Sequence, residues 1–164
     1  MLFLALTGQR REEVAQLKWH EIDEQTRTWC IPAERTKNDK AHIIHLSEPA
    51  WAVISEHLGQ PEEYVFATSR GKRFQSFKEA KRTLDRICGV GGWRLHDLRR
   101  TVVSGMARLG VPPHVADKIL NHQSGTISGV AAVYQRHEFL AERKGALDRW
   151  GTHIEHFIQT HKST

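Results

Sequence analysis

The chain has 164 residues, of which 39% are hydrophobic and 26% are charged, and this balance is ordinary for one globular domain. It excludes a low-complexity chain, and the apolar start, residues 1–6, is too short to span a bilayer and lacks a secretory signal's basic region and cleavage site. The formal net charge of +5 favours an anionic partner such as nucleic acid, although many basic proteins bind none.

Hydrophobic periodicity predicts a mainly α-helical chain with a small β region. After a helical piece that ends at Thr7 and Gly8, the expected helices cover residues 11–19, 48–58, 76–88, 95–109, 112–120 and 130–150, the last of them broken near Gly145. Residues 28–31 and 42–46 are rich in β-formers and flank a polar turn, so they predict a hairpin, and residues 64–67 are expected to add a third strand. We therefore expect an α+β fold, mainly helical, with a small antiparallel three-stranded sheet at one edge.

Two further segments carry structural expectations. The helix expected at residues 76–88 has an apolar stripe that should face the core, formed by Phe77, Ala80, Leu84 and Ile87. Residues 151–164 are expected to form a short, polar, frayed tail. The apolar residues 2–6 resemble the end of a buried helix, so we expect the chain to begin inside a larger protein.

The two cysteines, Cys30 and Cys88, could form only one disulfide. Without a secretory signal, we expect two reduced, partly buried thiols in a cytoplasmic protein.

Five short segments carry residue types that suit phosphodiester chemistry: LTGQRREEV at 6–14, RTKNDKAHIIHLS at 35–47, HDLRRT at 96–101, LNH at 120–122 and VAAVYQRH at 130–137. In order and spacing they resemble the phage-integrase branch of the tyrosine recombinases. Any one segment is a weak signal, whereas the ordered set of Arg, Lys, His, Arg, His and Tyr is a strong one. The resemblance implies a tyrosine-recombinase catalytic domain over residues 1–150, followed by the tail at 151–164, with the family's N-terminal core-binding domain absent.

The chemistry explains why these residue types belong together. An attacked phosphodiester gains negative charge on its non-bridging oxygens, and Arg10 and Arg99 can each present a rigid fork of donors to them. A tyrosine hydroxyl has a pKa of about 10, so Tyr134 needs nearby cations or a base to act as the nucleophile at neutral pH. The product would be a 3′-phosphotyrosyl intermediate that keeps the bond energy, so no ATP, metal or other cofactor is expected.

The resemblance assigns the remaining catalytic roles. His96 is the expected proton acceptor, and His122 the expected hydrogen-bond donor to the phosphate. Lys37, in a hairpin turn that can reach the minor groove, resembles the general acid that protonates the leaving hydroxyl, and Lys40 is a rival for this role.

Two residues are expected to support the site or leave it unchanged. Glu13 lies one helical turn from Arg10 and is expected to hold that arginine in place. Asn121 stands where glycine is common in the family, and we expect no effect on the chemistry.

Ordinary structural explanations exist for each residue taken alone, such as a solvated arginine, a helix cap or a core aromatic. Several basic residues could contact DNA phosphates or could only form a solvated face: Lys40, Arg70, Lys72, Arg73, Lys78, Lys81 and Arg82. A metal site is not expected at the tail histidines His153, His156 and His161, because they lack a nearby cysteine and the chemistry needs no metal.

The expected partner is double-stranded DNA that contains attachment sites. The resemblance implies a site-specific recombinase that integrates or excises a phage or mobile element. It further implies a tetramer on DNA for the full-length protein and a monomer for this fragment, with the tail either docked on a neighbouring protomer or packed on its own core. One alternative is a type IB topoisomerase, which the phage-type sequences of the LTGQR and HDLRRT segments disfavour. The other is a non-catalytic DNA-binding remnant, which is disfavoured because all six catalytic positions are filled.

Overall fold

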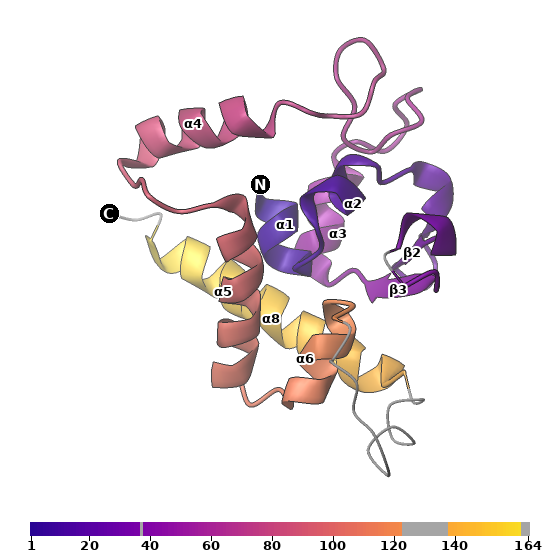
Figure 1. Cartoon of the computed structure of the whole chain (residues 1–164), viewed down its shortest axis with the longest axis vertical. Helices are drawn as coiled ribbons and strands as arrows, with labels where there is room; N and C mark the ends of the chain where they lie inside the picture. Colours follow the sequence, from indigo (N-terminus) through magenta and orange to yellow (C-terminus); the bar gives the residue numbers. More distant parts are fainter. Residues whose placement is uncertain (37, 123–137, 162–164) are drawn as a thin grey trace.

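Helix α1 (Leu2–Thr7) lies at the centre of the fold in this computed structural model, which describes residues 1–36, 38–122 and 138–161 (Figure 1). Its apolar side chains Phe3, Leu4 and Leu6 are buried, and the helix packs against α3, α5 and α8. The helix ends at Gly8, whose φ of 66° lies in the left-handed region that glycine adopts without strain.

The sheet follows α2 (Arg11–Ala15) and the 3₁₀ turn η1 (Trp19–Glu21), so α2 is shorter than the expected helix at 11–19. Strands β1 (Ile22–Asp23), β2 (Thr28–Ile31) and β3 (His42–His45) form an antiparallel sheet in the order β1-β2-β3. In the register, Trp29 of β2 faces Ile22 on one side and Ile44 on the other. A second 3₁₀ turn, η2 (Ala33–Arg35), follows β2.

The predicted hairpin and the three-stranded sheet are therefore confirmed, but the predicted third strand at 64–67 is wrong. The third strand is the two-residue β1. Residues Tyr64 and Ala67 form only isolated bridges, to Lys18 and Arg73. Residues 65 and 66 form a turn between these two bridges, and no described strand lies alongside them.

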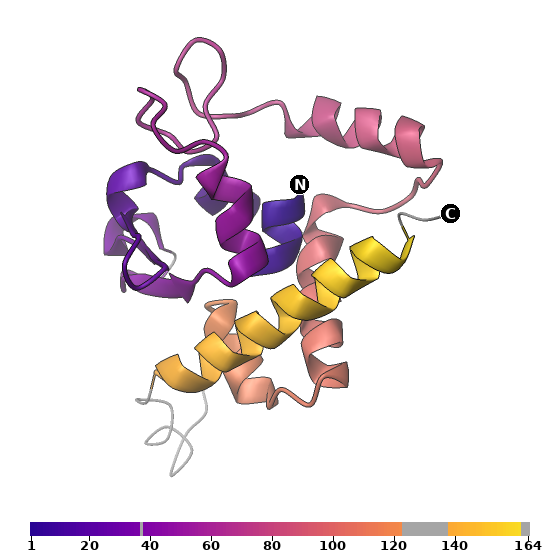
Figure 2. The same ribbon diagram turned by 180° about the vertical axis from the view of Figure 1, so that it is seen from behind.

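Five longer helices complete the part of the fold that the structure describes: α3 (Glu48–Ser55), α4 (Phe77–Cys88), α5 (Leu95–Arg108), α6 (Pro113–Ile119) and α8 (Leu140–His161). The helices expected at 48–58, 76–88, 95–109 and 112–120 are confirmed. Helix α8 crosses the back of the molecule and packs against α1, α3, α5 and α6 (Figure 2). Within the described ranges, no helix is both long and apolar enough to cross a membrane.

Helix α4 differs from the prediction in what it buries. Of its expected apolar stripe only Phe77 is buried, and Ile87 is 75% exposed. The helix lies at the edge of the molecule (Figure 1), and its described contact with another helix is at its first residue, where Arg11 of α2 lies over the Phe77 ring. The periodicity predicted the helix correctly, but not whether another element would cover its apolar face.

Helix α8 also corrects two expectations. It begins at Leu140 and continues through Gly145 without a break, because that glycine is exposed and a helix tolerates it at modest entropic cost. Residues 151–161 are its last turns, so this part of the tail is not frayed. Gly151 is buried, and a Cβ there would lie 2.5 Å from the Oγ of Ser47, so α8 and α3 approach very closely.

Both cysteines are free and exposed, although partly buried thiols were expected. Cys30 alternates along β2 with the buried residues Trp29 and Ile31, so its side chain lies on the outer face of the sheet. Cys88 ends α4, the helix whose apolar face is uncovered.

Candidate active site

The last turn of α6 brings two of the predicted catalytic residues together. The final carbonyls of a helix lack partners within that helix. Here the Leu120 carbonyl accepts a hydrogen bond from Nη2 of Arg99, and the Asn121 carbonyl accepts one from Nη2 of Arg10 at 3.3 Å. Adjacent carbonyls therefore hold the two guanidinium groups beside each other. We call the segment Ile119–Asn121 the α6 cradle.

Arg99 is the buried member of the pair, with 5% of its surface exposed. Its Nη1 also donates to the Gly8 carbonyl at 2.6 Å, which joins the end of α1 to the cradle. Burial, and then the positive charge of Arg10, lower the pKa of Arg99 to about 10. Arg99 remains charged at neutral pH, and an anion placed beside it and Arg10 would relieve the repulsion between them.

Arg10 is held from its other side by Glu13. The backbone N–H of Arg10 donates to Oε2 of Glu13 at 2.7 Å, and its Nη1 donates to Oε1 at 2.8 Å. Glu13 is only 7% exposed, whereas the side chain of Arg10 is 36% exposed. One carboxylate thus caps α2 and fixes the guanidinium, in the place where Glu13 was expected, and part of Arg10 still faces solvent.

The two predicted histidines lie on either side of Arg99 along the chain. His122 directly follows the cradle and is exposed, and its Nδ1 lies 3.3 Å from Oδ1 of Asp117. Asp117 therefore faces Nδ1 of the ring, and Nε2 is the ring nitrogen left to contact a phosphate. His96 is exposed in the first turn of α5, three residues before Arg99, and this spacing places both side chains on neighbouring parts of one helix face.

Lys37 and Tyr134 lie outside the described residues, so the predicted general acid and nucleophile have no described position. The neighbours of Lys37 in the chain are described. Nδ2 of Asn38 donates to Oδ1 of Asn121 at 2.9 Å, which attaches the β2–β3 turn to the α6 cradle.

Two buried basic residues, His42 and Arg143, lie behind the Ile119 carbonyl of the cradle. Nε2 of His42 lies 3.0 Å from the Ile119 carbonyl oxygen, and Nη2 of Arg143 lies 3.5 Å from Nδ1 of the same ring. Burial, and then the charge of Arg143, lower the pKa of His42 to about 4, so the ring is neutral and donates through Nε2. Arg143 is 4% exposed and pairs with Glu138 at 3.5 Å, and Glu138 in turn pairs with Lys118 of α6 at 3.0 Å.

Sequence reasoning did not single out several residues of this site: Gln9, Asn38, His42, Asp117 and Arg143. Gln9 illustrates the reason, since its Nε2 donates at 2.9 Å to the Ile119 carbonyl, 110 residues away in the chain. No local spacing signals such a contact. The only signal in the sequence was that a buried polar residue must find a partner.

The residues suggested as DNA contacts differ in how free their charges are. Most are exposed: Lys40, Arg70, Lys72, Lys78 and Arg82. Three of the full set form ion pairs with neighbouring acids: Arg73 with Glu12, Lys81 with Asp85 and Arg82 with Glu79. Lys81 also lies over the ring of Trp93, 4.8 Å from its centroid. These pairs reduce the charge that DNA phosphates would meet.

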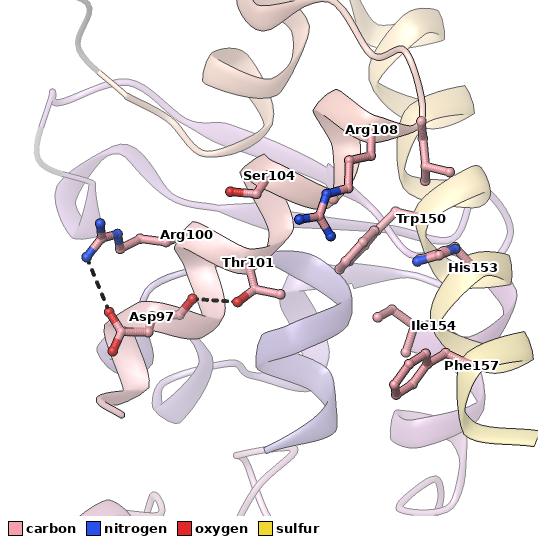
Figure 3. A pocket seen from close by; sticks show the side chains of 11 residues that line it. Asp97, Arg100, Thr101, Ser104, Arg108, Trp150, His153, Ile154 and Phe157 are labelled. Atoms are coloured by element: carbon pink, nitrogen blue, oxygen red, sulfur yellow. Dashed lines mark hydrogen bonds and ion pairs between the residues drawn. The ribbon is translucent and has the colours of Figure 1, made fainter. Parts of the chain in front are cut away.

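A groove between α5 and the C-terminal half of α8 is distinct from the candidate active site (Figure 3). Ser104 and Arg108 line it from α5, and Ile154 and Phe157 from α8, whereas Arg10, His96, Arg99 and His122 do not line it. Within residues 1–36, 38–122 and 138–161, no group of three His, Cys, Asp or Glu side chains could hold a metal ion. Of the tail histidines, His161 stacks on Phe157 with ring centroids 4.1 Å apart.

Comparisons with known proteins identify the family. Residues 1–139 match the model of the phage integrase family. The chain is 28% identical over 148 residues to prophage integrase IntA of Escherichia coli (strain K12), which covers 88% of this chain and 35% of that protein. It is also 28% identical over 131 residues to the integrase of Salmonella phage P22, which covers 71% of this chain and 34% of that protein.

Solved structures show the same fold. The integrase from mycobacterium phage Brujita has a TM-score of 0.70 and 21% identity, covering 91% of this chain and 49% of that one. XerA recombinase has a TM-score of 0.65 and 24% identity, covering 81% of this chain and 52% of that one. The chain therefore spans about a third of the length of its curated relatives and about half of these structures.

Proposed function

This chain belongs to the phage integrase family, and we propose that it is the catalytic domain of a site-specific DNA recombinase. The observation that carries the proposal is the pair of arginines on the α6 cradle. Glu13 and backbone carbonyls fix Arg10 and Arg99 side by side. Preorganised donors of this kind stabilise a developing oxyanion because they need no reorganisation during the reaction.

In the proposed reaction, the Tyr134 hydroxyl oxygen attacks the scissile phosphorus, and its proton passes to His96. The bond from phosphorus to the 5′ oxygen breaks, and Lys37 protonates that oxygen as it leaves. The product is a 3′-phosphotyrosyl linkage and a free 5′ hydroxyl. Attack by the 5′ hydroxyl of a second strand reverses these steps and releases Tyr134, so strand exchange needs no external energy source.

The described residues account for binding the phosphate. Arg10 and Arg99 donate to the non-bridging oxygens, where negative charge grows during attack. His122 donates through Nε2 while Asp117 holds its other ring nitrogen. Glu13 keeps Arg10 in place and takes no part in bond making.

The proposed partner is double-stranded DNA with attachment sites, bound in the cytoplasm of a bacterial cell. The net charge of +5 supports this, as do the DNA complexes of structural neighbours. These include the Tn1549 transposon integrase in complex with circular intermediate DNA, and XerH bound to its difH substrate. We propose that the whole protein acts as a tetramer on DNA, for integration or excision of a phage or mobile element.

The domain boundary expected at residue 150 falls inside α8. We propose that the catalytic domain includes at least the turn that follows, because Gly151 is buried and Ile154 packs against the core. Only the later, exposed turns of α8 remain accessible to a neighbouring protomer.

The test is covalent trapping on a nicked duplex that carries the attachment sequence, taken from the ends of the integrated element and read on a denaturing gel. The chain contains two tyrosines, Tyr64 and Tyr134, so Tyr64→Phe is a matched control. The whole protein encoded by the reading frame should form an adduct that Tyr134→Phe abolishes and Tyr64→Phe preserves. An adduct that survives Tyr134→Phe, or that requires added magnesium, contradicts the proposal. Relaxation of a supercoiled plasmid without a partner site would favour a topoisomerase instead.

A further inference from the structure

Asn121 adopts a backbone conformation that a glycine, without any side chain, could adopt. Its φ is 49°, in the left-handed region, and its N–H donates to the Lys118 carbonyl at 3.2 Å, which ends α6. Its own carbonyl binds Arg10. Glycine adopts this conformation with less strain and would provide the same backbone donor and acceptor. The amide side chain must therefore be explained by what it contacts.

That contact is a reciprocal pair of amide hydrogen bonds with Asn38. Nδ2 of Asn38 donates to Oδ1 of Asn121 at 2.9 Å, and Nδ2 of Asn121 lies 3.5 Å from Oδ1 of Asn38. Both residues are half-buried, and 83 positions separate them in the chain. The pair joins two segments that are distant in the chain, and it favours one position of the turn.

The turn around Asn38 is also held from within. Thr36 is 5% exposed, and its hydroxyl lies 2.8 Å from the carbonyl oxygens of both Ala33 and Lys40. The Lys40 N–H donates back to the same hydroxyl oxygen at 3.2 Å. Thr36 therefore fixes the internal shape of the turn, and the pair with Asn121 fixes where the turn lies relative to the α6 cradle.

We propose that Asn38 and Asn121 are positioning residues for the general acid. Through their amide pair they hold the β2–β3 turn, which contains Lys37, against the same cradle residue that binds Arg10. Asn38, which follows the proposed proton donor in the chain, and the phosphate-binding Arg10 thereby share one anchor. The inference rests on the proposed function, because it takes Lys37 as the general acid.

The substitution Asn121→Gly tests this cleanly, because it removes the amide and keeps the left-handed backbone. In the whole protein on its nicked attachment duplex, single-turnover cleavage should fall about 10- to 100-fold, as a misplacement of about 1 Å typically produces. A substrate with sulfur in place of the 5′ bridging oxygen should be cleaved at the wild-type rate. A thiol has a pKa of about 8.5, so the thiolate leaves without an acid.

Three further variants sharpen the result. Asn38→Ala should show the same loss and the same recovery on the sulfur substrate. The double variant should be no slower than either single variant, because the two residues act through one contact. Cys30→Ser, on the outer face of the same hairpin, should cleave both substrates normally.

Unchanged cleavage of the oxygen substrate by Asn121→Gly would overturn the inference. Equal losses on both substrates would also overturn it, since the pair would then act on the phosphate site or on folding. Failure of the proposed function is distinguishable from either result. In that case Tyr134→Phe would still form an adduct, or Lys37→Ala would cleave the oxygen substrate at the normal rate.

Discussion

The two arginines at the α6 cradle and the basic residues of helix α4 are both candidates to contact DNA phosphates, yet the two regions are built in opposite ways. At the cradle, two arginines are fixed by a buried carboxylate and by carbonyls from two other segments. On α4, the basic side chains are mostly exposed, some pair with acids of the same helix, and Ile87 and the following Val90 lie uncovered at 75% and 56% exposure.

The difference separates two kinds of cation. A guanidinium held in one geometry can stabilise a particular transition state, because its orientation is set before the reaction. A mobile surface lysine contributes charge, which attracts DNA without orienting it and is screened by salt. The cradle is therefore suited to chemistry and α4 to binding.

The largest expected effect tests the cradle directly. Arg10→Lys or Arg99→Lys keeps the charge but loses the fork of donors, so single-turnover cleavage should fall about 10²- to 10³-fold, as for loss of one preorganised donor. Arg100→Lys is the control, because Arg100 is exposed and its ion pair among the described residues is with Asp97 at 3.6 Å. A loss of similar size at Arg100 would show that charge alone, not geometry, matters.

A pair of glycines compares the two regions in stability. Gly8, at the cradle, and Gly89, at the end of α4, share φ 66° and ψ 11°. A Cβ at Gly8 would lie 2.7 Å from Leu120, whereas a Cβ at Gly89 would meet nothing within 4 Å. Gly8→Ala should lower the free energy of unfolding by about 2–5 kcal/mol, from strain and crowding together, and Gly89→Ala by about 1–2 kcal/mol from strain alone. Equal losses in urea denaturation would contradict the close packing at Gly8.

The cradle should also respond to acid through His42. Its folded pKa of about 4 lies below the unfolded value of 6.5, so the unfolded chain takes up a proton first as the pH falls. Stability should decline by up to about 3 kcal/mol between pH 6.5 and 4, with no further loss from this group below pH 4. The charged groups that act on the ring are Arg143, Arg99 and Glu138.

Urea denaturation of the wild type and of His42→Gln across this range measures the contribution of His42. The variant should be less stable at neutral pH but should lose less stability as the pH falls. Parallel pH profiles for the two proteins would assign the acid sensitivity to other groups.

The smallest effect is expected on α4. Lys78 and Arg86 form no ion pair within the part of the chain that the structure describes. Replacing both with Gln should weaken DNA binding, and should reduce the slope of log K against log salt by about 0.9 for each phosphate that the variant no longer neutralises. The single-turnover cleavage rate at saturating protein should not change. A slower rate with an unchanged slope would place α4 in the chemistry.

The sequence predicted local structure where residues within one segment determine it. Helix α5 and the β2–β3 hairpin follow from their own periodicity. The third strand could not be predicted in this way. Strand β1 has only two residues, and residues 64–67 have the residue types of a strand but no described partner strand. The prediction that the apolar stripe of α4 faces the core was wrong for a related reason, since only the tertiary fold decides whether a helix face is covered.

The site shows the same division. The ordered motifs mark Arg10, Arg99 and His122 without any geometry. In the structure, both arginines donate hydrogen bonds to the turn that ends α6, and His122 follows that turn directly. The contacts that hold them span 91 residues from Arg99 to Gly8 and 111 from Arg10 to Asn121. The sequence identifies Asn121 as a replacement for glycine, which its φ of 49° supports, but no local pattern predicts its contact with Asn38.

The charge of the scissile phosphate offers the sharpest test of the cradle. Replacing one non-bridging oxygen with a methyl group removes the negative charge that Arg10 and Arg99 are proposed to bind. Cleavage rates for wild type, Arg99→Lys and Lys78→Gln on the normal and the methylphosphonate duplex form two thermodynamic cycles. We predict that Arg99→Lys loses far less on the neutral substrate than on the charged one, while Lys78→Gln behaves additively. Additive behaviour of Arg99→Lys would contradict the proposed role of the cradle, because the guanidinium would then not act on the phosphate charge.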